Sequence, residues 1–168
     1  MDKEKFKEIY ICDLILNEIY SEANKRSIAW LASEINHEES SLNKLLSKNN
    51  SIQTKLLFDI SIATKVDFFY CFSKILDKFS VEIPNDIIMN DQTQICELIH
   101  KILKKKRRSV AWLASKVYNN NRNSLNILLK PNRNSIDTDV LLNISIALEF
   151  DFFFCFSKIL SKYSPRKI

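Results

Sequence analysis

The 168 residues include 25 Lys and Arg against 20 Asp and Glu, a formal net charge of +5, and 46% of them are hydrophobic. This balance predicts one or two globular domains with a packed core and excludes a disordered chain. The absence of glycine excludes the glycine-rich phosphate loops of dinucleotide- and nucleotide-triphosphate-binding enzymes. Because no apolar run approaches a membrane span and the N-terminus lacks the apolar block of a signal peptide, we expect a cytoplasmic protein with no membrane partner.

The sequence contains an internal repeat. Residues 51–80 match residues 135–164 at 19 of 30 positions without a gap, and SIAWLAS at 27–33 corresponds to SVAWLAS at 109–115. Such self-similarity predicts two copies of one structural unit. The predicted division is repeat 1 at 1–80, a linker at 81–92 and repeat 2 at 93–168.

Each repeat is predicted to be all-α, with about five helices, because its apolar residues recur at helical spacing. In repeat 1 the predicted helices cover residues 5–23, 28–35, 39–47, 54–65 and 68–79. The last helix of each repeat has an aromatic stripe, which we expect in the core, with an apolar arc wide enough to add a second buried contact that could join the repeats. The predicted N-caps, which accept otherwise unpaired helix amides, are Ser27, Ser109, Asp67 and Asp151.

Each repeat also contains two short amphipathic helices joined by a turn, which is a helix-turn-helix pattern. Ala32 and Ala114 are small where the two helices would cross, and the WLA, SIDT-like and DFF segments follow in the same order twice. In these features the chain resembles the phage-repressor-like regulators of the Xre or Cro/C1 class. The resemblance implies an all-α fold of two repressor-like five-helix helix-turn-helix domains in tandem, side by side or related by a pseudo-twofold axis.

The turn departs from the family pattern, which usually has glycine there. Repeat 1 has Asn36 in the turn, and repeat 2 has YNNN at 118–121, one residue longer. Asparagine is the next best residue for a left-handed backbone. The longer turn could place the recognition helix of repeat 2 at an unusual angle.

The resemblance implies that the second helix of the motif enters the major groove of DNA while the first crosses the backbone. If Asn121 caps this helix in repeat 2 and Leu125 and Leu128 face the core, the opposite face carries side chains suited to base edges. Arg pairs with guanine, Asn with adenine, and an apolar side chain contacts the thymine methyl. The predicted base contacts are Arg122, Asn123, Asn126 and Ile127.

Basic residues flank the same helix and predict phosphate contacts, which raise affinity and salt dependence without reading sequence. The alternative for the basic run is a solvated helix end, since cations there complement the helix dipole. The predicted phosphate contacts are Lys104, Lys105, Lys106, Arg107, Arg108, Ser124, Lys130 and Arg133.

Repeat 1 differs in charge. Residues 10–80 hold 8 basic and 9 acidic side chains, net −1, whereas residues 93–168 hold 14 and 5, net +9. Glu38 and Glu39 lie where repeat 1 would approach phosphates, so we expect repeat 2 to be the main DNA reader. Repeat 1 would be a weaker reader, a pseudo-dimer partner or a protein-binding copy. Its predicted weaker DNA contacts are Ser40, Asn43 and Lys44.

The expected function is therefore a sequence-specific, nucleoid-associated transcriptional regulator whose partner is double-stranded DNA. The repeats could form an intramolecular pseudo-dimer, or the whole chain could form a homodimer. The alternatives are a protein-interaction module, antitoxin-like or anti-regulator, and a non-specific nucleic-acid binder. We expect no enzyme, cofactor or metal site, because the two histidines and four cysteines form no catalytic or metal-binding pattern.

Overall fold

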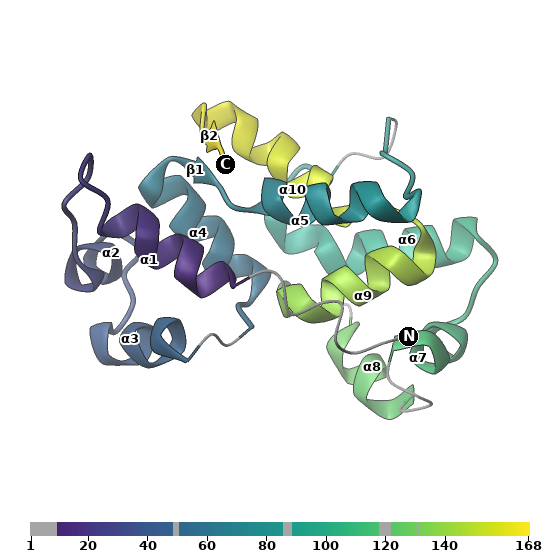
Figure 1. Ribbon diagram of the computed structural model, residues 1–168. Coiled ribbons are helices and arrows are strands. Elements are labelled where there is room, and N and C mark those ends of the chain that lie inside the picture. Colours follow the sequence, from purple (N-terminus) through teal and green to yellow (C-terminus); the bar gives the residue numbers. More distant parts are fainter. Residues whose placement is uncertain (1–9, 49–50, 86–88, 118–121, 131) are drawn as a thin grey trace.

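The computed structural model describes residues 10–48, 51–85, 89–117, 122–130 and 132–168. This part of the chain is mostly helical, as predicted (Figure 1). Repeat 1 contains α1 (Ile11–Ile19), α2 (Ile28–Glu34), α3 (Glu39–Ser47), α4 (Thr54–Thr64) and α5 (Phe69–Leu76). Repeat 2 contains α6 (Ile95–Lys105), α7 (Val110–Val117), α8 (Arg122–Leu128), α9 (Thr138–Leu148) and α10 (Phe152–Leu160).

Short 3-10 helices and strands complete the described chain. The 3-10 helices are η1 (Asp77–Phe79), η2 (Gln92–Gln94) and η3 (Ser161–Tyr163), and the two strands are β1 (Val66–Asp67) and β2 (Arg166–Lys167). None of the helices described is long and apolar enough to cross a membrane.

The helix bounds predicted for repeat 1 agree with α2 to α4 to within one residue, and α5 with η1 covers the predicted last helix. The first helix is shorter than predicted, because it ends at Ile19 rather than at residue 23. There the chain turns back, with the Arg26 amide donating to the Ile19 carbonyl (2.9 Å) and Lys25 in the left-handed region (φ 46°). The beginning of that predicted helix, before residue 10, lies outside the described residues.

The four predicted capping hydrogen bonds form, although the N-cap of α5 is Phe68 and Asp67 lies one residue before it. In each, the side-chain oxygen accepts a hydrogen bond from the backbone amide three residues later, which satisfies one of the free donors at the helix start. The donor–acceptor distances are 3.1 Å at Ser27, 3.0 Å at Ser109, 3.2 Å at Asp67 and 3.0 Å at Asp151.

The aromatic stripes of α5 and α10 pack against each other, and so form the contact that the sequence indicated could join the repeats. Phe69 stacks on Phe156 (4.4 Å between ring centroids, 6° between planes), and Phe72 stacks on Phe153 (4.5 Å, 10°). In the repeat, Phe69 corresponds to Phe153 and Phe72 to Phe156, so the two stacks are the same contact made twice. All four rings are almost completely buried. The contact between the repeats is therefore reciprocal, as it is across a twofold axis.

Backbone hydrogen bonds repeat this reciprocity at the starts of α4 and α9. The Thr54 amide donates to the Ile136 carbonyl (2.8 Å), and the Thr138 amide donates to the Ile52 carbonyl (2.9 Å). Gln53 and Asp137, equivalent residues 84 apart, form the antiparallel bridge between them and a side-chain hydrogen bond of 2.9 Å. The polar segments before α4 and α9 thus pair around the same pseudo-twofold axis as the phenylalanines.

A third reciprocal contact follows the last helix of each repeat. The Glu82 amide donates to the Glu149 carbonyl (2.9 Å), and the Arg166 amide, at the equivalent position, donates to the Lys65 carbonyl (2.8 Å). Glu82 also bridges Phe150, while β2 pairs in parallel with β1. The segment after the last helix of each repeat therefore pairs with the segment before the last helix of the other repeat. Glu82, in the predicted linker, takes part in this pairing.

Candidate nucleic-acid interface

The helix pairs α2–α3 and α7–α8 correspond to the two predicted helix-turn-helix patterns (Figure 1). In repeat 1, Asn36 adopts the predicted left-handed backbone (φ 53°), and the next amide, of His37, donates to the Ala32 carbonyl (2.8 Å). This closes the turn without glycine, since asparagine tolerates positive φ better than most residues. The turn at 118–121, with the proposed cap Asn121, lies outside the described residues.

Leucines one helical turn apart anchor both candidate recognition helices. Leu42 and Leu46 of α3 are fully buried, as are Leu125 at the equivalent place in α8 and Leu129 just after it. The prediction that Leu128 faces the core is only partly right, because Leu128 is half-buried. The two buried leucines of this helix, Leu125 and Leu129, are thus four residues apart, whereas the predicted pair was three apart. Both spacings fit the helical period of 3.6 residues.

The first helix of each repeat contacts the recognition helix through a cysteine. The Cys12 thiol of α1 donates to the Leu45 carbonyl (3.6 Å), and Cys96 of α6 donates to the Leu128 carbonyl (3.5 Å). In repeat 2 the His100 ring adds a contact between its Nε2 and the Leu129 carbonyl (2.6 Å). Sequence reasoning assigned no role to these residues, although the equivalent placement of the cysteines was a signal. They position α3 and α8 on the scaffold.

The exposed face of α8 agrees with the prediction where side chains are described. Asn126 and Lys130 are exposed, and Ile127 is 49% exposed. Arg122, Asn123 and Ser124 belong to α8, but their side chains lie outside the described part. The helix thus presents a polar face with one apolar side chain to solvent.

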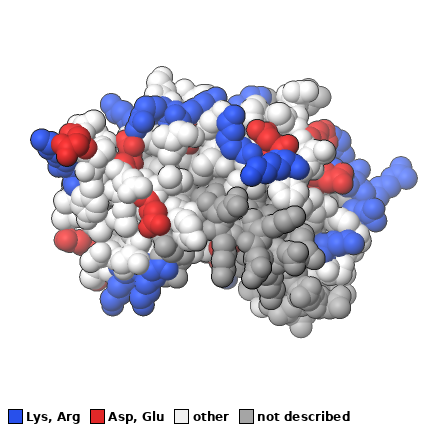
Figure 2. All heavy atoms as spheres, in the orientation of Figure 1, with Lys and Arg blue, Asp and Glu red and all other residues white. Residues whose placement is uncertain are grey.

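The basic run spans the connection from α6 to α7. Lys104 and Lys105 form the last turn of α6, where they also complement the helix dipole, and Lys106 caps it. Arg107 takes the left-handed conformation (φ 52°), as Lys25 does at the equivalent place in repeat 1. Lysine and arginine side chains project at the right-hand end of Figure 2, where Figure 1 places this connection.

This positive flank begins close to α8. His100, whose ring contacts the Leu129 carbonyl, is one helical turn before Lys104. Arg133 is exposed, and its charge opposes the burial that raises the pKa of the Cys96 thiol, which contacts the Leu128 carbonyl. Arg133 therefore lies near the end of α8, and the basic run begins one helical turn beyond the His100 contact with Leu129.

An arginine–tryptophan stack lies at the start of the first helix of each motif. The Arg108 guanidinium lies over the Trp112 ring at 4.7 Å, and Arg26 lies over Trp30 at 4.1 Å. Stacking restricts the guanidinium while leaving its edge donors available for an anion. The sequence prediction included Arg108 but not its equivalent, Arg26.

The face of α3 is exposed but acidic where it begins. Asn43 and Lys44 point to solvent, as predicted. Ser40 donates to the Glu38 carboxylate (2.5 Å), and Ser41 donates to its other oxygen (3.2 Å). These hydrogen bonds lower the pKa of Glu38 and keep it charged. A negative charge therefore lies at the start of α3, and the next residue, Glu39, is equivalent to Arg122 of α8.

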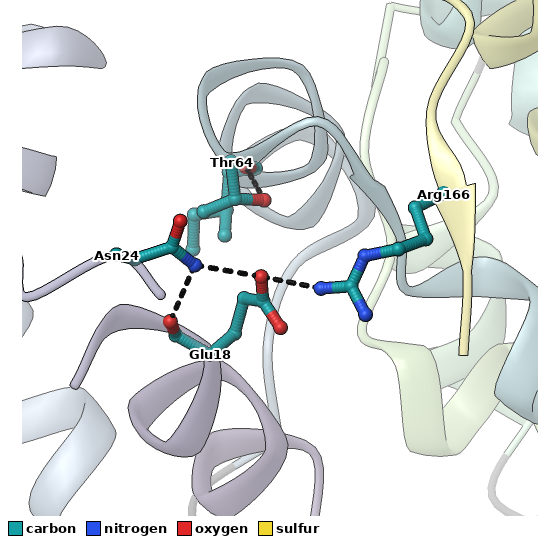
Figure 3. Close-up of polar contacts among 5 residues, drawn as sticks. Glu18, Asn24, Thr64 and Arg166 are labelled. Atoms are coloured by element: carbon teal, nitrogen blue, oxygen red, sulfur yellow. Dashed lines mark hydrogen bonds and ion pairs between the residues drawn. The ribbon is translucent and has the colours of Figure 1, made fainter. Parts of the chain in front are cut away.

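An ion pair specific to repeat 1 fixes α1 to the end of the chain (Figure 3). The Arg166 guanidinium of β2 contacts the Glu18 carboxylate (2.5 Å), which also accepts from the Asn24 side-chain amide (2.9 Å). The equivalent positions hold Ile102 in repeat 2 and Glu82 in the predicted linker, so no such pair can form with α6. The first helices of the two repeats, α1 and α6, are consequently attached to the rest of the chain differently.

Within the described chain, no group of three or more His, Cys, Asp or Glu residues is placed to hold a metal ion. Cys12, Cys96 and Cys155 are buried and Cys71 is half-buried. Burial raises the pKa of the Cys71 and Cys155 thiols to about 12, so both are protonated at neutral pH.

Comparison of the chain with protein-family models, with curated proteins and with solved structures gives no match. The function is therefore argued from the site itself.

Proposed function

We propose that this chain is a sequence-specific double-stranded DNA-binding regulator of transcription, of the phage-repressor-like helix-turn-helix class, and that α8 reads the bases. It would act on the nucleoid in the cytoplasm. The observation that carries the proposal is the two-sided character of α8. Leu125 and Leu129 anchor one side, while Asn126, Ile127 and Lys130 face solvent on the other.

The chemistry of that exposed face suits the major groove. An Asn side-chain amide can form hydrogen bonds with N6 and N7 of adenine at the same time. An apolar side chain such as Ile127 can contact the thymine methyl group. Lys130 would reach a phosphate. Arg122 and Asn123 share the helix and would extend the contact to guanine and a further base.

Phosphate attraction would come from the basic flank. Lys104 to Arg108 lie in the last turn of α6 and the α6–α7 connection, Arg133 lies between α8 and α9, and the Arg108 guanidinium stacks on the Trp112 ring. Contacts of this kind fix register on the duplex and make affinity fall with salt, but they carry no sequence information.

The direct test is selection of binding sites from a random duplex library, followed by titration of a selected and a scrambled duplex at several salt concentrations. The proposal predicts enrichment of one motif and binding of the selected duplex at least about a thousandfold tighter than the scrambled one. Equal binding with a steep salt slope would instead indicate a non-specific nucleic-acid binder.

The second candidate function is a protein-interaction module, and the charged Glu38 at the start of α3 favours it for repeat 1. A basic protein surface would suit this helix end better than a phosphate backbone. Absence of binding to any duplex at low salt would favour this function for the whole chain.

A further inference from the structure

The contact between the repeats has the pattern of a symmetric dimer interface. In such an interface, residue i of one partner touches residue j of the other, and j touches i in return. Here Phe69 stacks on Phe156 as Phe72 stacks on Phe153, and the backbone bonds of Thr54 and Thr138 repeat the pattern.

This interface is already filled within one chain. Phe69, Phe153 and Phe156 are completely buried and Phe72 is 2% exposed, so a second chain could use these surfaces only after the repeats had separated. The large apolar residues that remain exposed in the described chain belong to separate elements rather than to one helix face, for example Tyr20, Phe79 and Tyr163. The structure thus supplies two helix-turn-helix elements without a second copy.

Both candidate recognition helices lie at the same end of the pseudo-twofold axis. The bridge between Gln53 and Asp137 follows α3 and α8 along the chain, and it lies on the axis because these residues are equivalent. In Figure 1, α3 and α8 both lie along the lower edge of the molecule, while α5 and α10 lie above them. A duplex running along that edge would meet both helices.

The two helices are not equal, so the two halves of such a site cannot be equal either. Position for position, Asn126, Ile127 and Lys130 of repeat 2 replace Asn43, Lys44 and Ser47 of repeat 1. Only the first asparagine is shared, and it would favour the same base in both halves.

We propose that a single chain binds one non-palindromic duplex site made of two unequal, inverted half-sites, with α8 on the stronger half and α3 on the weaker. This inference rests on the proposed function and adds the class of DNA and the stoichiometry. The half-sites would be about one helical turn, or roughly 10 base pairs, apart.

The test uses the full chain and a duplex chosen by selection. Native mass spectrometry should give one chain per duplex, and the selected motif should show a strong and a weak half. Inserting five base pairs between them should lower affinity by about tenfold, to that of the strong half alone, because the rigid interface cannot follow half a turn of DNA. Two chains per duplex, a palindromic motif, or full affinity after the insertion would overturn the inference.

A surface variant tests the position of α3 without disturbing the interface. E38Q/E39Q should raise affinity for the composite site several-fold, because it removes two charges that face phosphate, and should not change affinity for the strong half alone. The matched control, E149Q, alters an exposed carboxylate in the α9–α10 connection and should change neither. Equal effects on the composite site and the strong half would contradict the placement of α3. If no duplex is selected at all, the proposed function fails instead.

Discussion

At the scale of single residues, two buried carboxylates lie at the starts of the central helices α5 and α10. Asp67 and Asp151 cap α5 and α10, and burial raises the pKa of each above the ordinary 3.8. Ser157 beside Asp67, and Ser73 beside Asp151, act in the opposite direction, and each serine belongs to the other repeat. These carboxylates therefore stabilise the helix starts at a cost in desolvation.

This arrangement predicts the pH dependence of stability. Between pH 3.8 and the raised native pKa, the folded state binds more protons than the unfolded state, so the free energy of unfolding falls as pH rises. D67N/D151N removes both titrations and keeps an oxygen that can cap. We expect a flatter stability profile on the acid side, and stability near neutral pH equal to that of the wild type or greater, in urea unfolding followed by circular dichroism.

Two further variants complete this experiment. E149Q, at an exposed carboxylate, should leave the slope as it is in the wild type. D67A should remove the cap and lower stability by about 0.5–2 kcal/mol. A slope that D67N/D151N leaves unchanged would show that other groups control the pH dependence.

The basic residues of the α6–α7 connection predict a salt effect. Neutralising Lys104, Lys105 and Lys106 to glutamine should make the slope of log K against log salt shallower by about 0.9 for each phosphate that the protein no longer neutralises. The ratio of specific to non-specific binding should stay within about twofold, because phosphate interactions carry no sequence information. The control, K25Q/R26Q at the equivalent turn of repeat 1, should change the slope less. A changed sequence preference would contradict a role limited to phosphate.

At the scale of elements, the α5–α10 contact is the main link between the repeats. Stacked aromatic pairs contribute about 0.5–1.5 kcal/mol beyond the burial of their area. Double-mutant cycles to leucine should therefore give a coupling energy of this size for Phe69 with Phe156, and a similar one for Phe72 with Phe153, by chemical denaturation. Substitutions of Leu42 and Leu125, in the cores of different repeats, should be additive. Additivity in both phenylalanine pairs would contradict the reciprocal interface.

Many of the helices, turns and helix contacts were predictable from the sequence. Helical spacing and capping residues predicted α2 to α5, and Asn36 predicted the left-handed turn. The aromatic stripes of α5 and α10 also indicated a contact that could join the repeats. These predictions succeeded because each depends on residues close together along the chain.

Other features depend on partners far apart in sequence. The Gln53–Asp137 bridge and the two-residue strands β1 and β2 are too short to show any periodicity. The Arg166–Glu18 ion pair joins residues 148 apart in the chain, and no local sequence pattern identifies them as partners. At the site, apolar spacing predicted the exposed face of α8, but spacing of three or four residues fits a helix equally well, so Leu128 was expected to be more buried than it is.

At the scale of the whole molecule, duplication gives one chain two versions of the same surface. Repeat 2 has the basic α6–α7 connection and the polar face of α8 with its one exposed apolar side chain. Repeat 1 has a charged Glu38 at the start of α3 and an ion pair between α1 and β2. Under the proposed function, a symmetric scaffold with two unequal recognition helices would suit an asymmetric DNA site. The equivalence of the repeats also provides internal controls, because each variant in α8 has a matched partner in α3.

The measurement that tests the central claim most directly compares N126A with N43A on the selected duplex by fluorescence anisotropy. These asparagines are equivalent and both are exposed, so neither substitution should change stability much. If α8 is the main base reader, N126A should cost about 1–3 kcal/mol and relax the preference at one base pair, whereas N43A should cost clearly less. Equal losses, or no loss from N126A, would contradict the account.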